Sequence, residues 1–510
     1  MSRWDTIVIG SGIGGLTAAC ALARAGQRVL VLEQHTVAGG MTQTFRRQGW
    51  TFATGVHYIG GVGNEPGAAG QFGRLLDWLS GGALRFASCG NPYDIVRLPG
   101  FEFGIEHPEA AYRAALLRLF PSQGPAIAHW FDEMESARRA AYAMLAARGM
   151  PPWLAWGLRL WRGREVQRYS QRTLAEALAE VPDERLRAVL GARWGDYGAP
   201  PDAAPLLEHA MVTGSYNAGA FFPIGGPARF AQALQSVIES AGGEVRLGAS
   251  ALRIVLSTGR ASGVLVRTHA GEQHETAAHV VSAMGVLNTA ACLEAGVAPE
   301  WQQAVHALKP GLSYVSLYIG FEGDIAAAGT SAANLWVYES LDIGRAWRDP
   351  TREDAPSMFV SFPSMKDSAF SSAPTAEVLV LCDSSSFAPW LHPVAGQRQA
   401  RYAATKARIE ERSLAQFNRH FPTLAPLVRY HELSTPVTQQ RFVRSPDGAM
   451  YGVEMTAARL GTSALNVRTP VPGLLLAGQD VAGAGVQAAA MSGLMAAAAI
   501  EPALLRQLRA

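Results

Sequence analysis

The sequence predicts an α/β fold in which a Rossmann-like dinucleotide-binding domain is assembled from discontinuous segments. Two observations at the ends of the chain carry this prediction: a glycine-rich turn between two short β-branched segments near the start, and a second glycine-rich turn near residue 480. A third is the return of strand and helix patterning at 222–299. We therefore assign the dinucleotide-binding domain to 1–61, 222–299 and 446–510, and a substrate domain with a mixed β-sheet and helices to 62–221 and 300–445.

The first unit of the predicted domain spans residues 5–33. Thr6–Ile9 is a β-branched run typical of a strand buried on both faces. Leu16–Ala25 is rich in Ala and Leu and stops at a glycine, which favours a helix. Residues 28–32 then predict a second buried strand, so the order is strand, turn, helix, strand.

The turn in this unit carries the spacing GxGxxG, through Gly10, Gly12 and Gly15, with Gly14 beside them. The first glycine permits a tight turn, the second lets a pyrophosphate approach the backbone, and the third lets the helix pack closely on the strand. The N–H groups at the start of the helix are free to bind phosphate. Glu33 ends the next strand, where a carboxylate accepts hydrogen bonds from a ribose diol.

A Gly-Gly step follows this carboxylate, in Gly39-Gly40-Met41-Thr42. Such a step recurs in flavoproteins of the amine-oxidase and phytoene-desaturase type, because the backbone there passes close to the cofactor. It favours FAD over NAD, and the chain has no second GxGxxG unit for a nicotinamide cofactor. The sequence therefore predicts a single bound FAD.

The C-terminal glycine-rich turn supports the same cofactor. Asp480 follows a predicted strand at 473–477 and is expected to bind the ribityl or pyrophosphate part of FAD. The helix after it starts near Gly485, so its N–H groups are expected to face the flavin and favour the anionic reduced form. The complete set of expected C-terminal and central contacts is Gly478, Asp480, Gly485, Val486, Gln487, Val245 and Ser282.

These motifs together resemble the retinol saturase and carotenoid isomerase group within the phytoene-desaturase-like flavoproteins. The matching stretches are 10–40, 55–60, 222–226, 282–285 and 473–493. The resemblance implies hydride transfer from reduced flavin that saturates a C=C bond of a long apolar lipid: a retinoid, a carotenoid or an unsaturated fatty acid. Met41 and Ala53 depart from the pattern, since the group often has a basic or cysteine-containing continuation at the first position and an Asp at the second.

Two consecutive polar residues, His57 and Tyr58, follow the glycine turn that this group places near the flavin. Either side chain could donate a proton to carbon while flavin N5 gives a hydride. The alternative is that both are satisfied core groups that shape the turn. We take His57 and Tyr58 as the candidate catalytic residues.

Other functions stay open. A polyene cis–trans isomerase that uses reduced flavin is the second reading, and a desaturase that passes electrons to a quinone or oxygen is the third. An escort protein that carries lipid without catalysis would lack the flavin that Glu33 and Asp480 indicate. An amine oxidase would need an aromatic cage, which the sequence does not place. The electron donor or acceptor is not identified by any motif.

Residues 140–164 predict a helical segment rich in Trp and Arg, with its densest part at 150–164. Trp and Arg on one helix suit a membrane interface, so we expect peripheral contact with lipid there. The alternative is an ordinary helix that covers the substrate domain.

Composition limits the remaining possibilities. Hydrophobic residues make up 48% of the 510 residues and charged residues 17%, which predicts a large apolar interior. A net charge of +2 without a basic block predicts no nucleic-acid binding. The four cysteines lack metal-ligand spacing, so no metal site is expected. The first strand follows the first residues directly, so we expect a cytoplasmic protein without an export signal.

Overall fold

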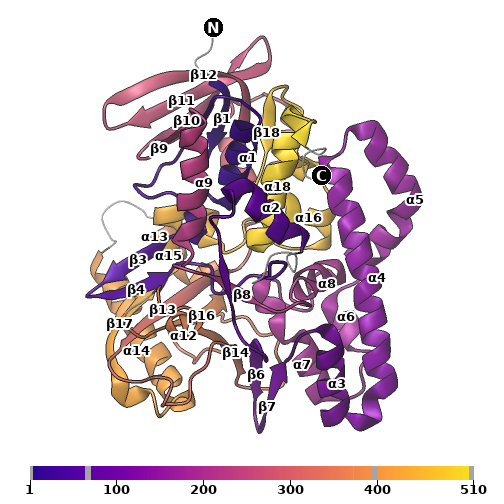
Figure 1. Cartoon of the computed structure of the whole chain (residues 1–510), viewed down its shortest axis with the longest axis vertical. Helices are drawn as coiled ribbons and strands as arrows, with labels where there is room; N and C mark the ends of the chain where they lie inside the picture. The colour runs from indigo at the N-terminus through magenta and orange to yellow at the C-terminus, as the bar shows by residue number, and fades with distance from the viewer. Residues whose placement is uncertain (1–3, 64–69, 371–372, 393–398, 505–510) are drawn as a thin grey trace.

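Two seven-stranded sheets organise the chain, one in the upper and one in the lower half of Figure 1. The computed structural model describes residues 4–63, 70–370, 373–392 and 399–504. Both glycine-rich turns lie at the upper sheet, and the chain crosses to the lower sheet and back between them. The α/β fold expected from the sequence is confirmed.

The upper sheet is mainly parallel at its centre. Its strands run in the order β10-β11-β12-β1-β2-β9, and β18 pairs with β12. Their bounds are β1 Trp4–Ile9, β2 Val29–Leu32, β9 Glu244–Arg246, β10 Ser250–Ser257, β11 Arg260–Thr268, β12 Gly271–Ser282 and β18 Leu474–Leu476. The sequence predicts one strand over 244–256, whereas the structure has two, because the chain turns at Gly248 with a positive φ of 64°.

The long strand β12 joins two kinds of pairing. Its first half pairs antiparallel with β11, and its second half, from Ala277, pairs parallel with β1. The end of the same strand also pairs parallel with β18, through Val280, Val281 and Ser282. Segments from the start, middle and end of the chain are therefore hydrogen-bonded side by side at the edge where the glycine-rich turns leave the sheet.

Four helices pack on this sheet and on one another: α1 (Ile13–Arg24), α2 (Gln71–Ser80), α9 (Ala228–Ser240) and α18 (Gly485–Ile500). Small residues allow α1 and α18 to touch, since a Cβ on Gly493 would lie 2.1 Å from the carbonyl oxygen of Gly14. Helix α2 lies after residue 62, where the substrate domain was expected to begin, but it packs with the upper sheet. Its buried side chains Phe72, Leu75, Leu76 and Leu79 belong to the core around α1, not to that of the lower sheet.

The lower sheet is mixed, with the order β17-β13-β16-β15-β14-β6-β7. The parallel pair is β14 with β6. The strand bounds are β6 Asp94–Leu98, β7 Phe101–Ile105, β13 Ser313–Phe321, β14 Asn334–Tyr338, β15 Ser357–Ser361, β16 Thr375–Cys382 and β17 Val428–Ser434. Alternate side chains face opposite layers: Tyr314 packs under a helical layer, whereas Val315 packs towards α14 (Gln399–His420).

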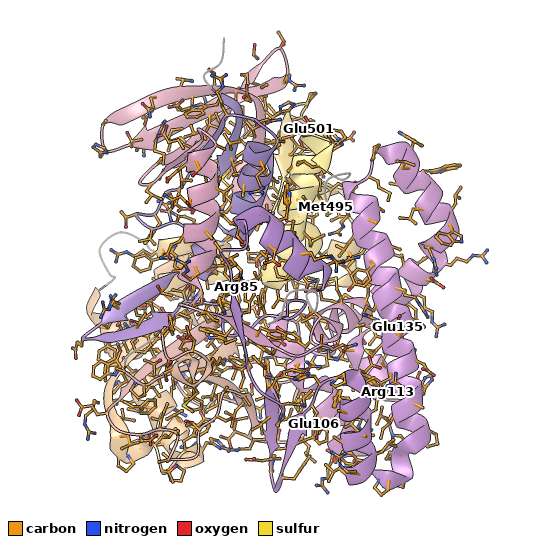
Figure 2. All side chains as sticks on the ribbon, viewed as in Figure 1. Arg85, Glu106, Arg113, Glu135, Met495 and Glu501 are labelled. Atoms are coloured by element: carbon orange, nitrogen blue, oxygen red, sulfur yellow. The ribbon has the colours of Figure 1, made fainter. Side chains whose placement is uncertain are left out.

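The helical layer on the Tyr314 side of the lower sheet comes from the first half of the chain and is drawn in purple on the right of Figure 1. Its members are α3 Glu109–Leu119, α4 Gly124–Gly149, α5 Pro152–Gln171, α6 Leu174–Leu178, α7 Glu184–Gly191 and α8 Leu206–Gly214. Helix α5 folds back along α4 at the edge of the molecule. Met495 of α18, labelled in Figure 2, lies beside the end of α4, because a Cβ on Gly149 would meet its side chain at 2.8 Å.

Candidate functional site

A cleft of about 640 Å³ runs along the edge where the glycine-rich turns leave the upper sheet. Segments from both ends of the chain form its walls, together with the loop after β12 and the region 439–453. Of the residues expected to bind the cofactor, those that line it are Gly10, Gly12, Gly14, Glu33, Gly39, Gly40, Met41, Thr42, Gly478, Asp480, Gly485 and Val486. The two ends of the chain thus form one elongated site.

Each glycine of the turn after β1 has a different structural reason to be glycine. A Cβ on Gly15 would lie 2.0 Å from the carbonyl oxygen of Gly10, so helix α1 sits directly against the turn. Gly10 has a positive φ of 98°. Gly12, in contrast, has an ordinary φ of −61° and no atom within 4 Å of an added Cβ. The protein itself leaves the space beside Gly12 open, as a close approach of phosphate requires.

Glu33 is buried at the end of β2 and still lines the cleft. Its Oε2 accepts hydrogen bonds from the backbone N–H of Ser11 at 3.0 Å and from the Ser11 hydroxyl at 2.6 Å. Its Oε1 accepts from the N–H of His35 at 2.7 Å. These bonds fix the carboxylate, and since a carboxylate has about four acceptor positions, one remains for a ribose hydroxyl.

The Gly-Gly step forms the wall opposite the first turn. Gly39 and Gly40 have positive φ values of 119° and 55° and open a short 3₁₀ turn over Gly40–Thr42. The N–H of Gly39 donates to the carbonyl oxygen of Ser11 at 3.1 Å, which fastens this step to the first turn. The Thr42 hydroxyl donates to the Gly39 carbonyl oxygen at 2.9 Å and closes the turn.

The Asp480 carboxylate accepts backbone hydrogen bonds from two other segments, a structural role that the sequence did not predict. Its Oδ2 accepts from the N–H of Val286 at 2.8 Å, and its Oδ1 accepts from the N–H of Val453 at 3.0 Å. One side chain therefore joins three segments that line the cleft. Gly452 is required beside it, because a Cβ there would lie 2.0 Å from Oδ1 of Asp480.

Four residues expected at the cofactor are not among those that line the cleft: Gly15, Val245, Ser282 and Gln487. Gly15 faces the turn of Gly10, as described above. Val245 packs on the core of the upper sheet, and the Ser282 hydroxyl is bonded to that of Thr289 at 2.7 Å. Gln487 lies beside Gly61, because an added Cβ at that glycine would be 3.0 Å from Oε1 of Gln487.

His57 directly follows Gly55 and Val56, which line the cleft. It is 7% exposed, and its Nδ1 lies 2.7 Å from Oε2 of Glu377 on β16. The N–H of Ala53 donates to the other oxygen of the same carboxylate. The second ring nitrogen of His57, Nε2, is buried and has no hydrogen-bond partner. A carboxylate thus orients the ring and leaves Nε2 without a hydrogen-bond partner, but neither His57 nor Tyr58 is among the residues that line the cleft.

Tyr58 lies between two carboxyl groups. Its Oη is 2.9 Å from Oδ2 of Asp196 and 3.3 Å from Oδ2 of Asp94. One hydroxyl donates only one hydrogen bond, so the second carboxyl is satisfied when it carries a proton itself. Burial raises the pKa of Asp196 to about 7 and that of Asp94 to about 6, while the cation Arg193 opposes both shifts. The group Tyr58–Asp94–Asp196 can therefore hold a proton near neutral pH.

Three acidic partners of these residues were not expected from the sequence: Glu377, Asp94 and Asp196. Glu377 stands alone among apolar residues in β16, and Asp94 opens β6; both have 0% exposure. A single acid inside a buried strand signals a fixed partner, because an unpaired buried charge is costly. That signal was present in the sequence, but the partners were not, since they lie far away along the chain.

One part of the cleft lining, here called the uncharged wall, carries no charged side chain. Its members are Met41, Gly55, Val56, Tyr314, Ala449, Met450, Tyr451 and Gly452. The Tyr451 ring also reaches towards the Asp196 segment, because a Cβ on Gly198 would meet it at 2.8 Å. Tyr451 therefore lines the cleft and also lies beside the segment that carries Asp196.

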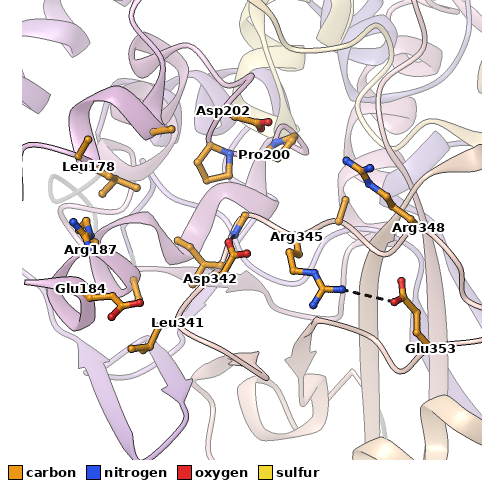
Figure 3. A pocket seen from close by; sticks show the side chains of 17 residues that line it. Leu178, Glu184, Arg187, Pro200, Asp202, Leu341, Asp342, Arg345, Arg348 and Glu353 are labelled. Atoms are coloured by element: carbon orange, nitrogen blue, oxygen red, sulfur yellow. Dashed lines mark hydrogen bonds and ion pairs between the residues drawn. The ribbon is translucent and has the colours of Figure 1, made fainter.

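A second cavity, of about 910 Å³, lies apart from the glycine-rich turns (Figure 3). It opens between α6, α7 and the segment 341–353. Its rim carries charges of both signs, and Arg345 forms an ion pair of 3.7 Å with Glu353. None of the residues expected at the cofactor lines it.

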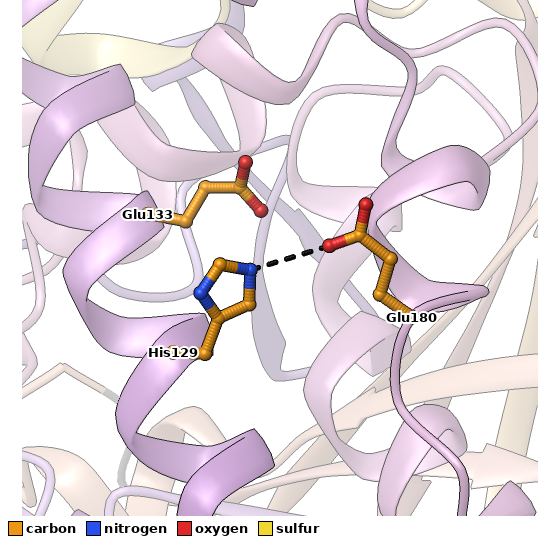
Figure 4. Close-up of side chains that lie close together, drawn as sticks. All are labelled: His129, Glu133 and Glu180. Carbon is orange, nitrogen blue, oxygen red and sulfur yellow. Dashed lines mark hydrogen bonds and ion pairs between the residues drawn. The ribbon is translucent and has the colours of Figure 1, made fainter.

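His129, Glu133 and Glu180 are the one group in the described part of the chain whose ligand atoms lie close enough for a metal ion (Figure 4). His129 Nε2 is 3.2 Å from Oε2 of Glu180. Arg172 bonds to both carboxylates, Glu133 and Glu180, so their charges are already compensated. The arrangement is that of an ion-pair network between α4, α6 and the end of α5.

Comparison with known proteins gives relatives that match nearly the whole chain. The chain is 32% identical to human all-trans-retinol 13,14-reductase over 98% of its length and 85% of the relative. It is 25% identical to the chloroplastic prolycopene isomerase of Arabidopsis thaliana over 97% of its length and 82% of the relative.

Among solved structures, putrescine oxidase bound to putrescine shares the fold, with a TM-score of 0.65 and 17% identity. That likeness covers 98% of this chain and 99% of the other. The family model described as flavin containing amine oxidoreductase matches residues 13–501. The chain therefore belongs to the flavin-containing amine oxidoreductase family.

Proposed function

We propose that the protein is an FAD-dependent oxidoreductase that saturates a C=C bond of a long apolar lipid, such as a retinoid, a carotenoid or an unsaturated fatty acid. The observation that carries the proposal is the uncharged wall of the cofactor cleft. Met41, Val56, Tyr314, Met450 and Tyr451 offer a hydrocarbon chain apolar and aromatic contacts. Similarity to human all-trans-retinol 13,14-reductase over nearly the whole chain supports the same reaction class.

An amine substrate fits this wall less well. An aliphatic amine is cationic at neutral pH, so its binding is favoured by a nearby carboxylate. Among the described residues that line the cleft, the acids are Glu33 and Asp480, and both oxygens of each already accept hydrogen bonds from the protein. The lining therefore favours a neutral hydrocarbon over a diamine such as putrescine.

The residues along the cleft fit FAD from end to end. Glu33 would bind the adenosine ribose, and the open space beside Gly12, at the start of α1, would take the pyrophosphate. Gly485 and Val486, at the start of α18, would face the flavin. When bound and reduced, FAD supplies the hydride for one carbon of the double bond.

Saturation also needs a proton for the second carbon, and the protein has two places that can hold one. His57 is oriented by Glu377 with its Nε2 unpartnered. The group Tyr58–Asp94–Asp196 holds a proton between a phenol and two carboxyls. We assign the proton donation to His57 and a supporting role as proton store to the second group. The two electrons come from a separate reductant that restores the flavin after each turnover.

The test is anaerobic incubation of the chemically reduced, FAD-loaded protein with retinoids, carotenoids and unsaturated fatty acids, followed by mass spectrometry. A product heavier by two hydrogens supports the proposal and identifies the substrate class. A product of unchanged mass with a shifted retention time would instead show a cis–trans isomerase, as the name of the Arabidopsis relative suggests. A purified protein that takes up no FAD would point to a lipid-escort function.

A further inference from the structure

The outer face of α5 exposes large apolar side chains. Trp153 is 71% exposed, Trp156 65%, Leu160 69% and Trp161 74%. Leu154 and Met150 beside them are also exposed. Large apolar side chains gathered on one surface mark a contact site for another apolar phase.

The exposed face belongs to a helix that is itself well packed. Trp153, Trp156 and Leu160 are spaced by three and four residues, so they share one side of α5. Ala155 and Tyr169 point the other way and are buried, where α5 packs against α4, α8 and α16 (Ala457–Gly461). The exposed tryptophans therefore take no part in the packing of α5 against the rest of the protein.

Basic residues continue the same face in the second half of α5. Arg164 and Arg168 are exposed, and the guanidinium of Arg162 lies 4.5 Å from the Trp161 ring centroid. The sequence of α5 contains four arginines and one acid, Glu165, which pairs with Arg162. Arg168 also lies 4.0 Å from Glu133 of α4, whereas Arg164 is exposed at the centre of the cationic half. An apolar aromatic half followed by a cationic half is complementary to a lipid surface with anionic headgroups.

We propose that the outer face of α5 docks the protein onto an anionic phospholipid membrane. Tryptophan rings suit the boundary between headgroups and acyl chains, because the indole is largely apolar and its N–H seeks a polar partner. Arg164 and Arg168 would meet lipid phosphates. Contact would be peripheral: none of the helices that the structure describes is long and apolar enough to cross a membrane.

Hydrogen bonds link the α4–α5 hairpin, which carries the exposed face of α5, to the segments beside the cofactor cleft. Arg148, in the last turn of α4, is buried and donates to the carbonyl oxygens of Val481, Arg459 and Leu460. Val481 follows Asp480, which lines the cleft. These hydrogen bonds fix the α4–α5 hairpin relative to the cleft. Docking through α5 would therefore hold the cleft at a fixed position relative to the lipid. This inference does not depend on the reaction proposed above.

Vesicle flotation of the FAD-loaded protein tests the proposal. We expect the protein to float with mixed phosphatidylcholine–phosphatidylglycerol vesicles, and the triple change Trp153→Ser, Trp156→Ser, Trp161→Ser to weaken the partition coefficient about tenfold or more. Arg164→Ser with Arg168→Ser should weaken binding to the mixed vesicles but not to pure phosphatidylcholine. The matched control is Leu117→Ser with Leu119→Ser, which removes two exposed leucines of α3 and should leave flotation unchanged.

Three flotation results would overturn the proposal: no flotation of the unchanged protein with either vesicle, unchanged flotation of the triple variant, or equal losses in the leucine control. A dimer in light scattering that becomes a monomer in the triple variant would also overturn it, since the face would then bind a second copy. Flavin absorbance and thermal unfolding show whether each variant is folded. If the triple variant fails that check, Trp161→Ser alone, at the most exposed of the three, gives the measurement.

Discussion

His57 and Glu377 are 320 positions apart in the chain, and their side chains meet with Nδ1 and Oε2 separated by 2.7 Å. The carboxylate fixes the ring and leaves Nε2 buried and unpartnered. An oriented imidazole with one available nitrogen is an arrangement that proton transfer requires.

We predict that His57→Gln lowers the rate of product formation by about 10²–10⁴-fold, the usual contribution of a positioned proton donor. Glu377→Gln should lower kcat with little change in KM, because it acts through the orientation of the ring. The chain offers a matched control: His431 and Glu410 form an exposed pair with the same 2.7 Å separation. His431→Gln and Glu410→Gln should leave kcat unchanged, and equal losses in both pairs would contradict the assignment.

The two glycines Gly12 and Gly15 should respond differently to alanine. Gly15→Ala forces a Cβ to within 2.0 Å of the Gly10 carbonyl oxygen and should lower the thermal stability of the FAD-free protein. Gly12→Ala meets no protein atom within 4 Å, so the FAD-free protein should unfold at an unchanged temperature. Its flavin absorbance after reconstitution should nevertheless be lost. Full flavin binding by Gly12→Ala would mean that phosphate does not pass there.

Asp196 should make folding stability depend on pH. Burial raises its pKa from 3.8 to about 7, so the folded state binds the proton more tightly than the unfolded state. This contribution is complete below the unfolded pKa and is lost as pH rises from about 4 to about 7. Asp196→Asn stays neutral and should remove that part of the pH dependence in urea unfolding. Asp77→Asn, at an exposed position of α2, should change nothing, and an unaltered slope in Asp196→Asn would refute the prediction.

Asp480→Asn should destabilise the protein even without FAD. Both of its carboxylate oxygens accept backbone hydrogen bonds, and an amide NH₂ would oppose one of the two N–H donors. The expected cost is about 1–3 kcal/mol in the free energy of unfolding, as for other buried groups left unsatisfied. Urea unfolding of the FAD-free protein measures it. A cost that appears only with FAD bound would show instead that the carboxylate binds the cofactor alone.

Local patterns predicted much of the fold. The amphipathic pattern of residues 109–119 predicts a helix, and α3 has those bounds. The apolar and aromatic pattern of residues 314–321 predicts a strand, and β13 begins one residue earlier. The hairpin of β6 and β7 was missed, although Pro99-Gly100 marks its turn, because it lies in a region dominated by helix patterns. Helix α2 was placed in the other domain, since an amphipathic helix does not specify which core its apolar side meets.

The sequence likewise predicted one part of the candidate site and not the other. The glycine-rich turns carry their spacing in consecutive residues, so the sequence could place them. The partners of His57 and Tyr58 could not be found, because Asp94, Asp196 and Glu377 come from three distant segments that only the folded sheet and its helices bring together. Hydrogen bonds that satisfy Asp480 were equally hidden, since their donors are backbone groups.

The pairing of β18 with β12 has a consequence for the order of events during synthesis. The last strand of the upper sheet and the segment that carries Asp480 and Gly485 leave the ribosome only after β1, β2 and β12 have all been made. Until then the cleft lacks a wall, and Val286 and Val453 lack the carboxylate that joins them. Tight capture of the flavin must therefore be a late event, and the nascent chain has to keep its unfinished apolar surfaces from aggregating before that point.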